Sequence, residues 1–143
     1  MTLTNDRMNH CLSVAKKMKE LVQKDPERYN ASPEEAFTIG ILHDIGYEFS
    51  DEQRVHASNG GLILKMQGYK YWKEIFYHGS VQSEYTSPEL WLLNYVDMIT
   101  GPTGDYTTAE DRIDDISLRY GTNSWQTKEA LALYKKLQEE GWL

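Results

Sequence analysis

Apolar residues recur at spacings of three and four along most of the chain, which is the pattern of amphipathic helices. In the first such stretch, residues 7–23, the apolar positions are Met8, Cys11, Leu12, Ala15, Met18, Leu21 and Val22. The same pattern predicts six further helices: from Pro33 to a stop at Gly46, 55–67, 70–78, 88–100, 108–120 and 125–140. No stretch alternates apolar and polar residues as a half-buried strand does. The sequence therefore predicts an all-α bundle of about six or seven helices.

Local signals fix several of these boundaries. "SPEE" at 32–35 is a capping box, in which Ser32 caps the helix and Glu35 reaches back to it. "SPEL" at 87–90 begins another helix in the same way, and Thr108 with Asp111 begins the sixth. With 143 residues, the chain is expected to form a single domain over 1–143.

Composition restricts the partners. The formal net charge is -7 and lysines and arginines form no cluster, so we expect no long nucleic acid as a ligand. No stretch reaches the roughly 20 apolar residues that span a bilayer, and the first ten residues do not form a signal peptide. Cys11 is the only cysteine, which fits a reducing compartment. We expect a cytoplasmic protein with no membrane partner.

Four histidines and two aspartates are the candidates for chemistry. His10, His43, His56 and His78 each lie on a predicted helix or at its edge, where facing helices of a bundle can bring side chains to one point. Asp44 follows an apolar run at a helix end, where the dipole disfavours negative charge. Asp97 lies in the apolar segment "LWLLNYVDMIT", where an unpaired carboxylate is costly. Both need a cation: Arg7, Arg112 or Arg119 could pair with Asp97, and a metal ion is the alternative.

These residues resemble the HD-domain superfamily of metal-dependent phosphohydrolases. The resemblance rests on "GILHDIG" at 40–46, on "YVDMIT" at 95–100 and on an early helical histidine, His10, with Arg7 three residues before it. His56 and His78 are similar to the two additional histidines of branches with a binuclear site. The resemblance covers a motif core of about 5–100 and leaves a helical tail at 101–143.

The resemblance implies two divalent metal ions, of which iron is favoured and manganese is next. His10, His43, Asp44 and Asp97 would hold the first ion, and His56 and His78 the second, with Asp44 as the bridging, catalytic carboxylate. The ions would activate a water molecule for attack on phosphorus. The substrate would be a small phosphorylated metabolite or a nucleotide. The most similar branch is the small bacterial one that hydrolyses dinucleoside tetraphosphates symmetrically, although Tyr47, Glu48 and Phe49 stand where that branch commonly has a lysine.

Several assignments around this site follow as hypotheses. The expected substrate contacts are Arg7, Ser58, Asn59 and Lys65. Glu48 and Asp51 could donate a proton to the leaving group, and a solvated loop explains them equally well. Trp142 near the C-terminus, expected to be exposed, could mark the contact of a homo-oligomer. Two other functions remain open at this point: a di-iron oxygenase of the same superfamily acting on a small phosphonate or polyol, and a non-catalytic metal-binding module.

Overall fold

The computed structural model describes residues 3–49, 52–81 and 84–143. These residues form seven α-helices and no strand; Thr100 and Tyr106 make an isolated bridge. The helices are α1 (Asn5–Lys24), α2 (Pro33–Leu42), α3 (His56–Met66), α4 (Trp72–Tyr77), α5 (Pro88–Met98), α6 (Ala109–Tyr120) and α7 (Trp125–Glu139). Short 3-10 helices lie at Pro26–Arg28, Ile45–Glu48 and Gln53–Val55. The predicted all-α class is confirmed.

The predicted capping box is present at the start of α2. The Glu35 backbone N–H donates to Ser32 Oγ at 3.1 Å, and the Ser32 N–H donates to Glu35 Oε1 at 2.9 Å. The predicted end at Gly46 was wrong, because the α-helix ends at Leu42 and the chain tightens into the 3-10 turn Ile45–Glu48. The histidine and aspartate of the motif therefore occupy the turn between two helical segments rather than a helix interior.

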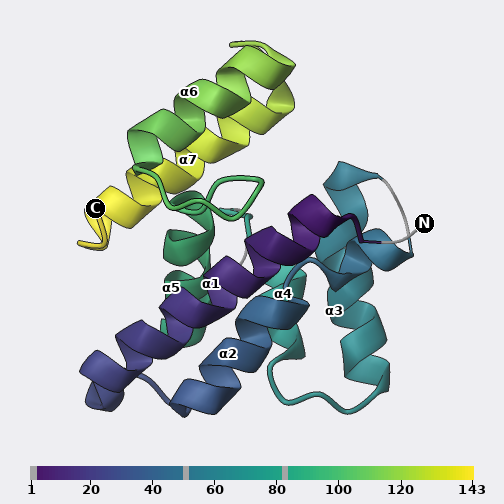
Figure 1. The fold of residues 1–143 in the computed structure, drawn as a ribbon, viewed down its shortest axis with the longest axis vertical. Helices are drawn as coiled ribbons and strands as arrows, with labels where there is room; N and C mark the ends of the chain where they lie inside the picture. Colours follow the sequence, from purple (N-terminus) through teal and green to yellow (C-terminus); the bar gives the residue numbers. More distant parts are fainter. Residues whose placement is uncertain (1–2, 50–51, 82–83) are drawn as a thin grey trace.

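Helices α1 and α2 pack side by side and antiparallel (Figure 1). Their close approach depends on Gly40, since a Cβ atom there would lie 2.5 Å from the Cα atom of Ala15. Figure 1 also shows α6 and α7 as a hairpin at the end of the molecule opposite α2 and α3. The bundle thus has a body made of α1 to α5 and a C-terminal hairpin above it.

Two hydrophobic clusters stabilise these parts. The larger includes Val14, Met18, Ile39, Ile75 and Leu92 and fills the body. The smaller joins the end of α5 to the hairpin through Met98, Ala109, Ile113, Ala130, Leu133 and Leu137.

Trp142 packs against both clusters. Its ring centroid lies 5.6 Å from that of Tyr95, and the Arg28 guanidinium lies 4.0 Å above it. The expectation that Trp142 is exposed was wrong, because the chain turns back after α7 and half-buries the indole. A role of this residue in a homo-oligomer stays a prediction.

A buried carboxylate, Glu89, anchors the connection between α1 and α2 to α5. Only 2% of Glu89 is exposed, and its Oε2 accepts hydrogen bonds from the backbone N–H groups of Asn30 at 2.8 Å and Ala31 at 3.3 Å. Since a buried carboxylate without partners is costly, these two bonds fix the α1–α2 loop against the first turn of α5.

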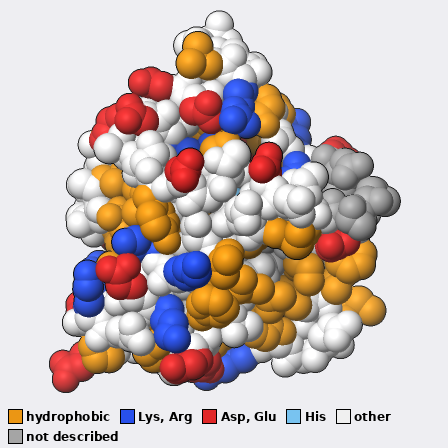
Figure 2. Space-filling view, viewed as in Figure 1, with side chains coloured by type: hydrophobic (Ala, Val, Ile, Leu, Met, Phe, Trp, Pro, Cys, Tyr) orange, Lys and Arg blue, Asp and Glu red, His pale blue; other side chains and the backbone are white. Residues whose placement is uncertain are grey.

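The surface mixes charged and apolar side chains. On the face drawn in Figure 2, hydrophobic side chains gather in the lower half, and acidic and basic ones are scattered around them. The exposed large apolar residues include Leu62 and Met66 of α3. In the part of the chain that the structure describes, no helix has both the length and the apolar character needed to cross a membrane.

Candidate metal centre

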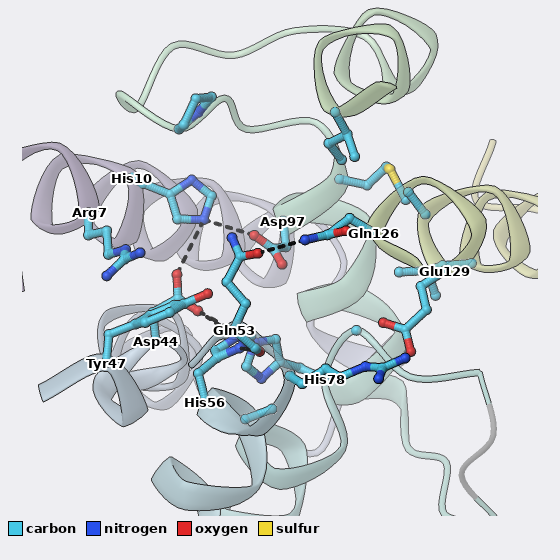
Figure 3. A pocket seen from close by; sticks show the side chains of 18 of the residues that line it. Arg7, His10, Asp44, Tyr47, Gln53, His56, His78, Asp97, Gln126 and Glu129 are labelled. Atoms are coloured by element: carbon cyan, nitrogen blue, oxygen red, sulfur yellow. Dashed lines mark hydrogen bonds and ion pairs between the residues drawn. The ribbon is translucent and has the colours of Figure 1, made fainter. Parts of the chain in front are cut away.

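Six side chains from five helical segments converge beside a cavity. Figure 3 shows how His10, Asp44, His56, His78 and Asp97 face one another there. His10 comes from α1 and Asp97 from α5, His43 ends α2 and Asp44 follows it, His56 begins α3 and His78 ends α4. We refer to these six residues as the His/Asp cluster. They are the six candidate metal ligands that the sequence predicted, and the structure brings all of them together.

Asp44 lies between two pairs of histidines. Its Oδ2 is 3.4 Å from His43 Nε2 and 3.8 Å from His10 Nε2. Its Oδ1 is 3.3 Å from His56 Nε2 and 3.5 Å from His78 Nε2. Because the two oxygens face different pairs, the carboxylate has the geometry of a bridge between two cation positions.

Asp97 lies beside the first of these histidine pairs, His10 and His43. Its Oδ1 lies 2.8 Å from His10 Nε2 and 3.5 Å from His43 Nε2. The arginines that could have paired with it have other neighbours: Arg119 and Arg112 lie beside Asp115, at 3.1 and 3.8 Å, and Arg7 lies over the Tyr47 ring. Among the described residues, the ion-pair partners of Asp97 are the two histidines.

Backbone carbonyl groups hold all four imidazole rings in the same tautomer. The Nδ1–H groups of His43, His56 and His78 donate to the carbonyl oxygen three residues earlier, at 2.7, 2.6 and 2.6 Å. His10 Nδ1–H donates to the Gly101 carbonyl oxygen at 2.9 Å. Since a carbonyl oxygen only accepts, each Nδ1 carries a proton and each Nε2 points into the cluster, where it offers a lone pair when the ring is neutral. This is the orientation that a metal-binding histidine needs.

The inward-facing nitrogens need a cation. The Nε2 atoms of His56 and His78 lie 3.2 Å apart, where two lone pairs repel unless a proton or a metal ion lies between them. His43 Nε2 is buried and has no hydrogen-bond partner among the described residues. Three groups within the cluster place one ligand atom of each member within 4.8 Å of the others: His10/His43/Asp44, His43/His78/Asp97 and Asp44/His56/His78. The set of imidazole and carboxylate donors fits a divalent transition-metal ion.

Electrostatics keep the two carboxylates ionised. Burial opposes this, but the nearby His43 together with hydrogen bonds from His56 and His78 lowers the pKa of Asp44 well below its usual range. The hydrogen bond from His10 and the nearby charge of His43 do the same for the pKa of Asp97. Burial lowers the pKa of His78, whereas for His43 and His56 the Asp44 carboxylate outweighs burial and raises the pKa. The carboxylates thus draw positive charge into the cluster.

Residues behind the cluster position His56. The Tyr47 ring stacks on the His56 imidazole with centroids 4.4 Å apart, and the Arg7 guanidinium covers the other side of Tyr47 at 3.6 Å. A Cβ atom on Gly46 would lie 1.8 Å from the His56 carbonyl oxygen, so only glycine lets the two backbones approach. Tyr47, noted in the sequence only for standing where a similar branch commonly has a lysine, therefore supports the candidate ligand His56 directly.

The cluster opens into a cavity of about 630 Å³. Of the expected substrate contacts, Arg7 and Ser58 line it. Asn59 and Lys65 do not: Lys65 lies nine residues beyond His56, about 13 Å along α3, and its Nζ is 4.8 Å from the Trp72 ring centroid. Glu48 accepts a hydrogen bond from the Leu3 backbone N–H at 3.2 Å, and Asp51 lies outside the described residues.

The C-terminal hairpin forms the far wall of the cavity, which the sequence analysis missed. From α6 the cavity is lined by Arg112, Ile116, Arg119 and Tyr120, and from α7 by Trp125, Gln126, Glu129, Ala130 and Leu133. The signal was present in the spacing, since the four α6 residues lie at i, i+4, i+7 and i+8 and so share one helix face. Their mixed polarity hid it, because a face that lines a cavity does not form a continuous apolar stripe.

Comparison with known proteins agrees with this geometry. The model of the HD domain family matches residues 7–113, which include the whole His/Asp cluster and the first turn of α6. Searches of curated proteins and of solved structures gave no match. The HD domain is typically that of metal-dependent phosphohydrolases, so the match and the cluster together indicate a metal-dependent hydrolase at the general level. The chain belongs to the HD domain family.

Proposed function

We propose that the protein is a phosphohydrolase that uses two divalent metal ions to cleave a phosphoester or phosphoanhydride bond of a small phosphorylated metabolite or nucleotide. The observation that carries the proposal is the position of Asp44, whose two oxygens face two separate histidine pairs at the floor of a cavity. One ion would be held by His10, His43, Asp44 and Asp97. The other would be held by His56 and His78, with Asp44 shared.

The chain's own residues provide orientation and charge. Four backbone carbonyl groups fix the imidazoles, so the ligands are preorganised and lose little freedom on binding. The two carboxylates, Asp44 and Asp97, would balance the charge of one of the two divalent ions. The charge of the other ion would remain to attract an anionic substrate. When bound, such ions lower the pKa of a water molecule and stabilise charge on phosphoryl oxygens. Arg7, fixed on Tyr47 at the cavity wall, is placed to hold a phosphoryl group.

The donor set favours iron, with manganese next, because imidazole with carboxylate suits these ions better than calcium or magnesium. The cavity volume falls within the range of small-molecule sites, about 300–1,000 Å³. A net charge of -7 argues against long nucleic acids. Within this class, a dinucleoside polyphosphate such as a dinucleoside tetraphosphate is the first substrate to test.

The test is a phosphate-release screen over nucleotides, dinucleotides and sugar phosphates with iron- or manganese-loaded protein, run anaerobically. The proposal expects release by the wild type and a loss of at least about 1,000-fold in H43A and D44A, which remove a ligand and the bridge. Anaerobic turnover would also set aside an oxygenase, which requires oxygen. If both variants kept the wild-type rate, the assignment of the His/Asp cluster as the reaction centre would fail.

A further inference from the structure

The two kinds of basic residue are distributed very differently around the cavity. Of the five arginines in the chain, Arg7, Arg54, Arg112 and Arg119 line it. None of the ten lysines, all of which lie in the described part of the chain, does so. Arginine presents a planar fork of donors that matches phosphate and carboxylate groups, whereas lysine is a flexible point charge. In a chain with a net charge of -7, this concentration of guanidinium groups points to an anionic ligand.

Two of these arginines belong to the hairpin and not to the body. Arg112 and Arg119 lie seven residues apart on the cavity-facing side of α6, with Asp115 between them. Arg119 Nε donates to Asp115 Oδ1 at 3.3 Å, while Arg112 Nη1 lies 3.8 Å from Asp115 Oδ2, beyond hydrogen-bond distance. Both guanidinium groups therefore lie near one carboxylate, which balances only one of their two positive charges. Among the described residues, the Nη groups of Arg119 have no hydrogen-bond partner.

The hairpin is also held in a defined position relative to the His/Asp cluster. The Gln53 side chain donates to Tyr120 Oη at 2.8 Å and accepts from Gln126 Nε2 at 3.1 Å. The backbone carbonyl of the same Gln53 accepts the hydrogen bond that orients His56. Figure 3 shows Gln53 reaching from His56 toward Gln126. One residue thus connects the second histidine pair to the hairpin, so a group bound by α6 would lie at a fixed distance from the cluster.

We propose that Arg112 and Arg119 form a second anion subsite, which binds a phosphate of the substrate other than the one that reacts at the His/Asp cluster. This inference rests on the proposed hydrolase function and narrows its substrate class to molecules with at least two phosphates. The second phosphate belongs either to a polyphosphate chain or to a separate position on the same metabolite. The tail of the chain, residues 101–143, then selects the substrate.

Glu129 of α7 gives the subsite a test of opposite sign. It is exposed and lines the same cavity, where its negative charge opposes the arginines. Its replacement by glutamine should strengthen the binding of a polyanion, while loss of the arginines should weaken it. A structural role in the hairpin would not produce opposite effects from the two changes.

The experiment measures binding of inorganic tripolyphosphate and of orthophosphate to metal-loaded protein by calorimetry. Tripolyphosphate is supplied as its magnesium complex, so that it does not remove the bound ions. We expect the variant R112Q/R119Q to bind tripolyphosphate at least about tenfold more weakly than the wild type and to bind orthophosphate within about twofold of it. E129Q should bind tripolyphosphate more tightly. The control K128Q/K135Q removes the same charge from exposed positions on α7 outside the cavity and should match the wild type.

Equal weakening by R112Q/R119Q and K128Q/K135Q would overturn the proposal, because only net charge would then matter. So would a wild type that binds tripolyphosphate no more tightly than orthophosphate. Hydrolysis of p-nitrophenyl phosphate in the same samples tests the proposed function separately. If phosphate compounds are hydrolysed but R112Q/R119Q shows no selective loss of tripolyphosphate binding, the subsite is refuted and the hydrolase remains. If the loss is selective but neither p-nitrophenyl phosphate nor any compound of the phosphate-release screen is hydrolysed, the subsite remains and the hydrolase is refuted.

Discussion

Gly46→Ala is expected to disturb the fold and the His/Asp cluster together. The added Cβ would lie 1.8 Å from the carbonyl oxygen and 2.6 Å from the carbonyl carbon of His56. Cβ atoms essentially never come within 3.0 Å of a heavy atom to which they are not linked through neighbouring bonds, so one backbone segment has to move by about 1 Å. Because the neighbour is backbone at the start of α3, no side-chain rotation can relieve the clash.

Overpacking of this kind costs about 1–3 kcal/mol, and the rigid neighbour places Gly46→Ala near the upper end, at about 3 kcal/mol. For a chain of this length, such a loss lowers the Tm by about 10 °C. The movement also displaces His56, whose Nε2 lies 3.3 Å from Asp44 Oδ1. We therefore expect weaker binding of the metal ion assigned to His56 and His78.

The assay is thermal unfolding of the chelator-treated protein, followed by a metal titration. Gly68→Ala is the control. The φ of 77° at Gly68 strains an alanine there, but no atom lies near the added Cβ. We therefore expect a loss of about 1 kcal/mol in the free energy of unfolding and unchanged metal binding. If Gly46→Ala were no more destabilising than Gly68→Ala and bound metal normally, the close approach of Gly46 to α3 would neither stabilise the fold nor position His56.

Substitutions at Tyr47 and Glu89 and the protonation of His43 each give a measurable effect. Tyr47→Ala removes the ring stacked on His56 and should weaken metal binding by about tenfold in a titration. Tyr47→Phe keeps the stacked ring and should change metal binding little. Equal effects of the two substitutions would contradict the role of the stacking. Glu89→Ala leaves two backbone N–H groups without their carboxylate and should cost about 2 kcal/mol in urea unfolding; a loss under 0.5 kcal/mol would refute the anchor. Because the pKa of His43 is raised, a metal ion has to displace a proton from this ring, so the affinity for the metal ion should fall from about pH 8 to about pH 6. Calorimetry in buffers of different ionisation enthalpy should detect the released proton. A metal affinity that does not depend on pH would contradict this prediction.

Local signals in the sequence predicted most of the fold because they act over a few residues. The Ser32–Glu35 box, the Thr108 cap and the apolar spacing of α1 each depend only on neighbours in the chain. The end of α2 was placed too late because the apolar run continues through Ile45, and hydrophobicity does not reveal that His43 Nδ1–H bonds back to the Gly40 carbonyl group. That bond gives the histidine two roles, one at the helix end and one in the cluster.

The His/Asp cluster was predictable as a set, but its surroundings were not. Six titratable residues at family spacings identify the cluster without any coordinates. The wall formed by α6 and α7 depends on how the hairpin packs over the body, and a sequence does not encode that as a local pattern. Lys65 was expected near substrate from its position on the helix that His56 begins, yet the length of α3 carries it away from the cavity.

The number of metal ions bound per chain tests the central claim most directly, since Asp44 faces both histidine pairs and Asp97 only one. Purified wild type, D44N and D97N, each loaded anaerobically with iron or manganese and desalted, would be compared by elemental analysis. The account predicts about two ions in the wild type, about one in D97N, where Asp44, His56 and His78 remain, and close to none in D44N. Two ions retained in D44N, or a wild type without metal after loading, would contradict it.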